Sequence, residues 1–444
     1  MKALNSKLKS LSLGLCLSVA FTPALLQAEL SPETMADFTS LPLVSADSAV
    51  PLVMIAASND HQNFFKAYND YTDLDRDGEI ETTYEHSFDY YGYFDSYRCY
   101  SHSGGASGIF EPAASKTADK YCGGGSWSGN FLNWATMTRI DTVRKILFGG
   151  LRTVDDVNTA AGGVARTVLE RAYLPNDAHS FAKYYDGDDL AKLTPFSVDE
   201  LTICNTTVAS DETLVSEKVI DPPLMRVAAG NHALWASNER WQCRWSEEKS
   251  ASNANDSSQS GIDASSSNPS SASDGLGSHD YAVKVDVCVS GREESNCKEY
   301  VNDDVDPPII SKNRIGLLQK FGDDDKVLFG MVAGSYLKNK SGGVVMKNIE
   351  SISEEIDQKN GQFDKAVTSG AAANPSTSYG IINTWSLYRP VGYYHVDGTY
   401  GQNGLNANSC EWGLNAFGDG QCMNWGNPFS EVYLNAIRYL AGKG

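Results

Sequence analysis

Three aspartates alternate with other residues in "YNDYTDLDRDGEIETTYE", residues 68–85, and their carboxylates could bind a metal ion. Asp73, Asp75 and Asp77 occupy positions one, three and five of a calcium-binding loop, and Gly78 follows where such a loop turns sharply. Calcium takes roughly six to eight oxygen ligands from carboxylates, carbonyls and water. The spacing therefore predicts a calcium site with the ligands Asp73, Asp75, Asp77, Glu79 (through its backbone carbonyl) and Glu81.

The loop departs from the full calcium-binding pattern at its twelfth position. Tyr84 stands where a bidentate carboxylate is expected, and Glu85 comes one residue late. Ile80 occupies the apolar eighth place, so we expect its side chain to point inward and hold the loop. We expect modest calcium affinity, and the alternative interpretation is an acidic turn that water keeps in place.

The cysteines predict a disulfide framework. Cys16 lies in the predicted signal peptide described below, which leaves an even number in an exported chain. These cysteines fall into neighbouring couples, and we expect the pairs Cys99–Cys122, Cys204–Cys243, Cys288–Cys297 and Cys410–Cys422. No Cys-x-x-Cys motif occurs, so zinc ribbons and thioredoxin-like redox chemistry have no support.

Catalytic motifs are absent from the sequence. The seven histidines are scattered, and no His-Glu-x-x-His, Gly-x-Ser-x-Gly or phosphate-binding glycine loop occurs. The only histidines that sit beside possible partners are His61, next to Asp60, and His179 in "NDAHS". A lone histidine is more often structural. We therefore expect that the chain is not an enzyme.

The amino terminus predicts export. Lys2, Lys7 and Lys9 precede the apolar run "LSLGLCLSVAFTPALL", and Ala28 offers a small residue for cleavage. We expect a signal peptide over residues 1–28 and a polar leader over 29–48, with no transmembrane segment in the remaining chain. The formal charge of −20 disfavours nucleic acid and anionic lipid as partners.

The sequence predicts strands and helices that would form the framework around the acidic loop and the cysteines. Residues 49–58 form an apolar run that predicts a strand buried on both faces of a parallel sheet. Residues 130–148 predict one amphipathic helix capped by Asn130. Alternating valines in "YAVKVDVCV", residues 281–289, indicate that the same sheet continues, and 327–333 and 380–389 are further expected strands.

Two later segments have distinct compositions. Residues 249–279 are rich in serine and lack large apolar groups, which predicts a disordered loop. In residues 427–442, Asn427 is expected to cap a helix that has Pro428 at its first position, carries an apolar face and stops at Gly442. The members of that face are Phe429, Tyr433, Ala436, Ile437 and Leu440. Because no further strand follows this helix, we expect a sheet that is incomplete at its carboxyl end.

Several blocks together resemble the N-terminal region of the PilY/PilC-type factors of bacterial type IV pili. The similarity runs from about residue 49 to residue 442, and the order of the blocks makes it specific. They include "NDYTDLDRDGEIETTYEHSFDYYGYFDSYRCY", "WSGNFLNWATMTRIDTVRKILFGG", "TVLERAYLPNDAHSFAKYY" and "GNPFSEVYLNAIRYLAG".

The resemblance implies an α/β fold: a von Willebrand factor A-like, doubly wound sheet over residues 49–444, with long disulfide-bonded insertions. It implies an exported protein of the periplasm, outer surface or pilus tip, which promotes pilus assembly and adhesion. The expected partners are minor pilins or pilus-tip proteins and a host or abiotic surface.

Two features depart from the family pattern. The family's large C-terminal β-propeller does not occur in these residues. The A-domain metal motif, Asp-x-Ser-x-Ser after the first strand, is replaced by "NDHQN". The matches at 256–260 and 263–267 lie in the serine-rich loop, so we expect no metal site of that kind.

Two other functions compete with this one. The chain could be a secreted calcium-dependent carbohydrate-binding protein or hydrolase that uses the aromatic stretch from Tyr90 to Tyr97. It could also be a truncated, non-functional remnant. Glycan binding or turnover would favour the first, and failure to form a folded, disulfide-bonded product would favour the second.

Overall fold

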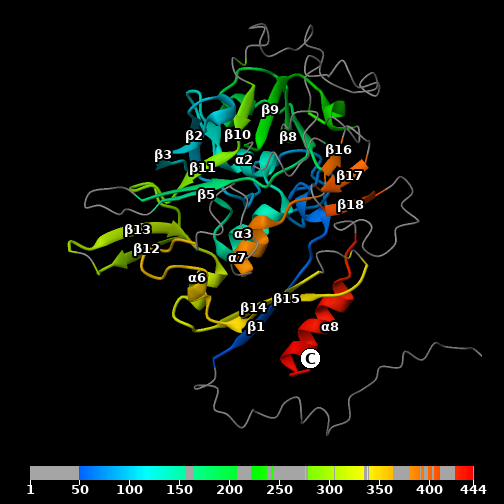
Figure 1. Ribbon diagram of the computed structural model, residues 1–444. Helices are drawn as coiled ribbons and strands as arrows, with labels where there is room; N and C mark the ends of the chain where they lie inside the picture. Colours follow the sequence, from blue (N-terminus) through cyan, green and yellow to red (C-terminus); the bar gives the residue numbers. More distant parts are fainter. Residues whose placement is uncertain are drawn as a thin grey trace, which may run out of the picture. The chain divides into compact units, whose positions relative to one another are not determined.

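Five sheets and several short helices are formed by the residues that the structure, a computed structural model, describes (Figure 1). Within residues 50–444 the contacts define one unit. The described residues are 50–156, 165–175, 177–207, 222–237, 242–243, 276, 279–304, 306–334, 338, 340–363, 380–390, 392–394, 399–402, 405–410 and 426–443. The predicted signal peptide, the polar leader, Cys422 and nearly all of the serine-rich loop lie outside them.

The sheet that contains the first strand has three members. β1 (Leu52–Ala57) pairs in parallel with β14 (Leu328–Ala333), and β14 pairs antiparallel with β15 (Val344–Glu350). Helices cover both faces of this sheet. One face packs against α3 (Arg139–Phe148), α6 (Leu317–Gly322), η7 (Ile352–Glu354) and α7 (Ile381–Leu387), and the other against α8 (Phe429–Leu440).

The remaining strands form sheets of their own. A four-stranded antiparallel sheet has the order β10-β9-β8-β7, from Asp280–Ala282, Leu224–Ala229, Leu201–Thr206 and Phe181–Tyr185. A six-stranded mixed sheet has the order β4-β2-β3-β11-β6-β5, from Trp127–Ser128, Arg98–His102, Phe110–Lys116, Lys284–Val287, Arg166–Glu170 and Arg152–Asp156.

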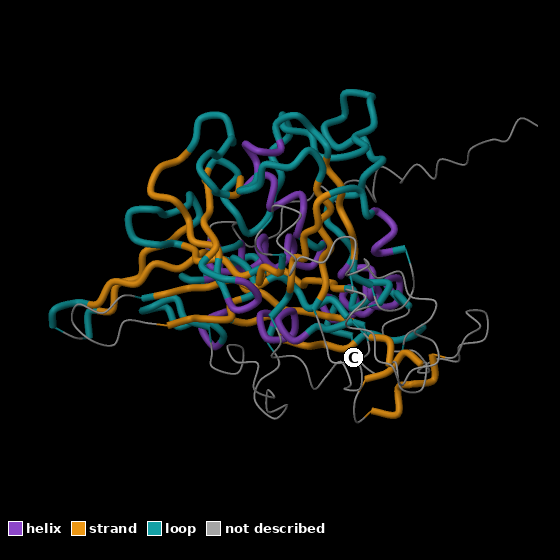
Figure 2. The backbone as a smooth tube through the Cα atoms, turned by 90° about the horizontal axis from the view of Figure 1, so that it is seen from above, coloured by secondary structure: helices purple, strands orange, loops and turns teal. Residues whose placement is uncertain are grey.

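Two smaller sheets and several short helices are the remaining described elements. β12 (Cys297–Asn302) and β13 (Ile309–Arg314) form a hairpin that extends to the left in Figures 1 and 2. The third antiparallel sheet contains β16 (Gly392–Tyr394), β17 (Thr399–Gln402) and β18 (Leu405–Cys410). The short helices are η1 (His61–Phe64), η2 (Gly105–Ser107), α4 (Leu190–Leu193) and η4 (Ala233–Ala236).

The larger core is aromatic and surrounds α2 (Gly129–Thr136), every residue of which is buried. Tyr90, Tyr93 and Phe94 from the predicted aromatic stretch lie in this core. The stretch therefore serves mainly as packing, although the Tyr91 and Tyr97 rings of the same stretch are exposed.

The predicted helix over residues 130–148 is two helices. α2 ends at Thr136, and α3 begins after Thr138, whose side chain and that of Asp141 form a capping box. Ser128, not Asn130, caps α2. The apolar spacing is compatible with one helix. The chain forms two because the capping box of Thr138 and Asp141 starts a new helix at the junction.

Other element predictions were wrong for tertiary reasons. β1 is a partly exposed edge among the described strands rather than a doubly buried strand. Residues 281–289 contribute to two sheets that do not contain β1, although Val283, Val285 and Val287 are buried as expected. The predicted strand over residues 380–389 contains the helix α7.

The chain is therefore mixed α/β, and a doubly wound A-type fold stays a prediction. None of the described helices is both long and apolar enough to span a bilayer.

Candidate metal centre

The acidic loop is closed at its base by backbone contacts. Thr72 and Glu81 form an antiparallel bridge, and the Tyr71 N–H donates to the Glu81 carbonyl at 2.6 Å. Gly78 has a φ of +97°, which an L side chain rarely adopts, so glycine suits the sharp turn. The loop therefore returns on itself within a few residues.

Carboxylates converge inside this turn. One oxygen from each of four side chains lies within 4.8 Å of the others; these are Asp73, Asp75, Asp77 and Glu81. All four also accept hydrogen bonds from backbone N–H groups of the loop, such as Arg76 N–H to Asp73 at 2.6 Å and Glu79 N–H to Asp77 at 2.8 Å. The backbone thus orients the carboxylates before any cation binds.

Two predicted details of the loop need correction or qualification. The Ile80 side chain is 59% exposed, so it does not hold the loop inward as predicted. Its place is taken by the bridge at the base of the loop. The Glu79 side chain is not part of the converging group, which leaves only the predicted carbonyl role for this residue.

The base of the loop is anchored to the larger core through Asp70. The buried Lys183 of β7 donates to Asp70 at 2.6 Å and to the Tyr68 carbonyl at 2.7 Å, and its ammonium lies 4.7 Å from the Trp134 ring centroid. Burial lowers the pKa of Lys183 to about 8, against the opposing effect of Asp70.

Tyr84, at position twelve, is also anchored in the core. Its hydroxyl accepts from the Asn130 amide at 2.9 Å, and burial raises its pKa well above the ordinary value. Tyr84 is therefore a structural residue and leaves position twelve without a carboxylate. The converging carboxylate oxygens are the type of ligand that hard cations such as calcium prefer, and fewer of them converge than the roughly six to eight oxygens that calcium takes.

Sequence reasoning missed Lys183. Along β7 the side chains of Phe181, Lys183 and Tyr185 are buried while those between them are less so. A lysine at an inward position of an alternating strand requires a charged or polar partner, and that signal could have identified it.

The two histidine pairs singled out from the sequence meet in the structure. His179 Nδ1 lies 2.6 Å from an Asp177 carboxylate oxygen, and the His61 and His179 rings meet edge to face at 5.4 Å. Burial, and secondly the charge of His179, lowers the pKa of His61 to about 4. His179 and Asp177 are buried and His61 is partly buried, so this cluster packs after the end of β1.

Among the described residues, three disulfides are present: Cys99–Cys122, Cys204–Cys243 and Cys288–Cys297. These are three of the four pairs expected from the cysteine spacing, and the fourth involves Cys422, outside the described residues. Each closes a local loop, and such links typically contribute about 2–4 kcal/mol by restricting the unfolded chain.

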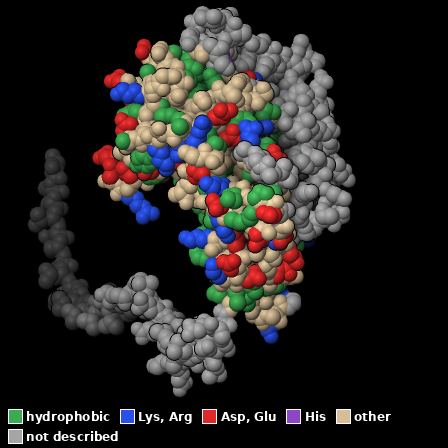
Figure 3. All heavy atoms as spheres, turned by 90° about the vertical axis from the view of Figure 1, so that its left-hand side faces the viewer, with side chains coloured by type: hydrophobic (Ala, Val, Ile, Leu, Met, Phe, Trp, Pro, Cys, Tyr) green, Lys and Arg blue, Asp and Glu red, His purple; other side chains and the backbone are tan. Residues whose placement is uncertain are grey.

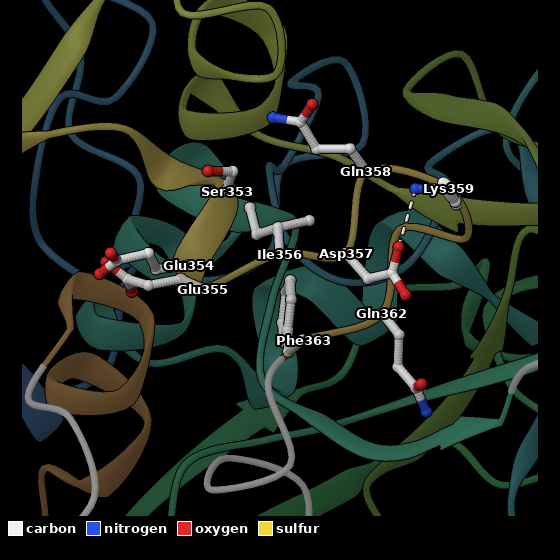
Figure 4. A pocket seen from close by; sticks show the side chains of 9 residues that line it. All are labelled: Ser353, Glu354, Glu355, Ile356, Asp357, Gln358, Lys359, Gln362 and Phe363. Carbon is white, nitrogen blue, oxygen red and sulfur yellow. Dashed lines mark hydrogen bonds between the residues drawn. The ribbon is translucent and has the colours of Figure 1, made fainter.

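A separate pocket of about 570 Å³ is lined by nine residues between Ser353 and Phe363 (Figure 4). One of its acidic residues, Glu355, is buried, and its carboxylate accepts a hydrogen bond from the Ile382 N–H at 2.7 Å, where α7 begins. Burial raises the pKa of Glu355. Lys359, at the opposite side, is paired with Asp304. These contacts support the walls of the pocket and assemble no nucleophile with a base among its lining residues.

Two family models match the chain. Residues 81–228 match the small alpha/beta domain of PilY1 homologs, and residues 329–444 match their second domain. The chain is also 32% identical over 410 residues to a "Type IV pilus biogenesis factor PilY1 homolog" of Xylella fastidiosa, an alignment that covers 88% of this chain. The chain belongs to the PilY1-type family. This finding confirms the resemblance described from the sequence.

The match covers only part of the relatives. This PilY1-type chain spans 24% of the length of that relative, and it is 39% identical to a second X. fastidiosa protein of the same name over 104 residues, 8% of that protein. No solved structure matches the chain.

Proposed function

We propose that the chain is an exported type IV pilus assembly component of the pilus tip, which promotes pilus biogenesis and surface adhesion through protein contacts. The observation that carries the proposal is the similarity over 88% of the chain to a protein named as a pilus biogenesis factor. Minor pilins or other pilus-tip proteins are the proposed partners, and a von Willebrand factor A-like sheet is the proposed framework.

Two features of the structure support export and a binding role. Disulfides persist in oxidising compartments outside the cytoplasm, and the structure has three. Most of the aromatic stretch and the histidine cluster is committed to packing. Such a cross-linked framework is compatible with a protein that acts outside the cytoplasm through its surface.

Calcium stabilisation of the acidic loop is part of the proposal. The converging oxygens of Asp73, Asp75, Asp77 and Glu81 are hard ligands, and they repel one another unless a cation is present. A bound calcium ion would therefore order the loop on the surface without taking part in a reaction.

The test of the pilus role is association. Pili are sheared from cells that express the chain and are purified, and the chain is sought in the pilus fraction and in a mutant that makes no pili. Recovery with pili, together with its loss from the same fraction of the pilus-free mutant, supports the proposal. Equal recovery from both strains contradicts it.

A further inference from the structure

The pocket that Figure 4 shows has an apolar floor. Ile356 and Phe363 lie opposite each other in an antiparallel bridge, so their side chains meet near its centre. Ile356 is 1% exposed and Phe363 2%, and the Arg152 guanidinium lies 3.6 Å from the centroid of the Phe363 ring. The pocket volume of about 570 Å³ is within the range of roughly 300–1,000 Å³ that is typical of ligand pockets. The floor is therefore held in place by packing, and the space above it can take a ligand.

Acidic residues outnumber basic ones among the residues that line this pocket. Glu354, Glu355 and Asp357 carry carboxylates, and Lys359 is the single basic residue of the lining. The Lys359 ammonium pairs with the carboxylate of Asp304, which follows β12 and is not part of the lining. The charge of Lys359 is thus offset from outside the pocket, so the pocket attracts cations.

The Glu355 carboxylate has an acceptor position that the described residues leave unfilled. Its side chain is 9% exposed, and Oε2 accepts from the Ile382 N–H at 2.7 Å, whereas Oε1 has no hydrogen-bond donor. The Lys347 ammonium lies 3.6 Å from Oε1, too far for a hydrogen bond, and donates to Glu350 at 3.1 Å. A buried acceptor without a donor is unfavourable, so a ligand that donates to Oε1 would be stabilised there.

The other two acids differ in what they can offer to a ligand. Glu354 is exposed, and no described residue forms a hydrogen bond or ion pair with its side chain. The Asp357 carboxylate, in contrast, accepts from the Lys359 N–H and from the Asn360 amide, each at 2.8 Å. Glu354 and Glu355 are therefore available to a ligand, whereas Asp357 mainly adds negative charge.

A cation on an aliphatic stem matches this arrangement. Arginine and lysine bury their stems on apolar surface and keep their charged heads at polar groups. Arginine fits better, because its planar guanidinium carries five N–H donors and can reach two carboxylates at once. An inorganic cation would leave the apolar floor unused, and an anion would be repelled. The formal charge of −20 also favours the approach of a basic partner.

We infer that this pocket binds an arginine side chain of a partner polypeptide. The aliphatic stem lies on Ile356 and Phe363, and the guanidinium donates to the carboxylates of Glu354 and Glu355. The inference rests on the proposed function, because it takes the partner to be a protein. It adds the chemistry by which such a partner is recognised.

Titration calorimetry of the purified chain with two short peptides tests the inference. The probes are acetyl-Gly-Arg-Gly-amide and the same peptide with citrulline, which has the shape of arginine without its charge. We expect the citrulline peptide to bind at least about tenfold more weakly than the arginine peptide, because the charge-assisted hydrogen bonds are lost. Glu354→Gln should weaken the binding of the arginine peptide by about tenfold for the same reason.

The matched control is Glu111→Gln. Glu111 is exposed on β3, so this variant removes the same charge from a different sheet. It should leave the affinity for the arginine peptide unchanged, and circular dichroism should show that both variants are folded. The inference is overturned if the arginine peptide does not bind, if the two peptides bind equally, or if both variants weaken binding equally.

The assay on sheared pili separates this inference from the proposed function. A chain that is recovered with pili but does not bind the arginine peptide contradicts the inference alone. A chain that binds the arginine peptide through Glu354, but is recovered equally from the pilus-free mutant, supports the inference and contradicts the proposed function.

Discussion

Lys183 connects the acidic loop to the larger core through a single carboxylate. It is fully buried and pairs with Asp70, which also pairs with the more exposed Lys66 at 3.1 Å. Two lysines thus share one partner in different surroundings. Because a buried ion pair costs most when one member is removed, the two lysines should differ strongly in their contribution to stability.

Replacing Lys183 with Met should lower the free energy of unfolding by about 3 kcal/mol, because Asp70 loses its buried partner. Replacing Lys66 with Met is the matched control and should cost less than about 1 kcal/mol, because the Lys66 side chain is partly exposed to solvent, unlike that of Lys183. Urea denaturation in calcium-free buffer measures both changes. Equal decreases in the free energy of unfolding would show that the burial of Lys183 does not increase its contribution to stability.

Calcium binding depends on the converging carboxylates. We expect calorimetry of the wild-type chain to give a dissociation constant of about 0.1–1 mM, because the bidentate ligand at position twelve is missing. Replacing both Asp75 and Asp77 with Asn should abolish the heat of binding. Asp188→Asn, in an exposed acidic turn outside the loop, should leave the heat intact. Undiminished binding in the double variant would rule out the proposed site.

The lowered pKa of His61 predicts that the stability of the chain depends on pH. Its pKa in the folded chain, about 4, is below the ordinary value of 6.5, chiefly because the ring is buried. Between these values the unfolded chain binds more protons, so the free energy of unfolding falls as pH drops from about 6.5 to about 4.

His61→Gln should flatten this dependence by an amount on the order of 2 kcal/mol over that range. Denaturation curves collected at several pH values measure it. The carboxylates that titrate in the same range are common to both proteins, so the difference between the two curves isolates His61. If the free energy of unfolding depends on pH in the same way in both proteins, the lowered pKa of His61 is contradicted.

At the level of elements, the junction between α2 and α3 is held by one capping box. The Thr138 hydroxyl donates to a buried Asp141 carboxylate oxygen at 2.6 Å and accepts from the Asp141 N–H. The second Asp141 oxygen accepts from the Ala172 N–H at 2.9 Å. The same carboxylate thus starts α3 and fixes the chain after β6.

Thr138→Ala should lower the free energy of unfolding by about 1–2 kcal/mol, because it removes the cap and one partner of a buried carboxylate. Thr138→Ser keeps the hydroxyl, so its free energy of unfolding should fall much less. Thermal or urea denaturation distinguishes them. If both variants lose the same stability, the missing methyl group, and not the cap, would explain the effect.

The sequence was most informative where local chemistry decides the structure. The alternating aspartates and Gly78 predicted a turn with converging carboxylates, and neighbouring cysteines predicted three of the pairs that are present. These features involve residues close along the chain. Their geometry is therefore largely fixed by spacing and by backbone preference.

Long-range contacts explain the errors. Apolar runs at 281–289 and 380–389 were assigned to one sheet, but periodicity cannot show which strands become neighbours or whether a short apolar run is a strand or a helix. Arg144 donates to the carbonyls of Trp385 and Tyr388 at the end of α7, a contact between residues far apart in sequence. No local pattern predicts such a cap.

At the level of the whole molecule, the chain combines a cross-linked interior with an acidic exterior. Asp and Glu side chains are spread over the face shown in Figure 3, with Lys and Arg among them. The described part of the chain contains three local disulfides and large aromatic and aliphatic cores. This combination suits a component that works outside the cytoplasm through contacts with other proteins.

The proposed role in pilus biogenesis can be tested by counting the pili on the cell surface. The count is made by electron microscopy in a strain that lacks this chain and every other PilY1-type copy, with and without the chain restored. We expect few pili in the deletion strain and a clear increase when the chain is supplied. Equal numbers of pili in both strains, despite normal production of the chain, would contradict it.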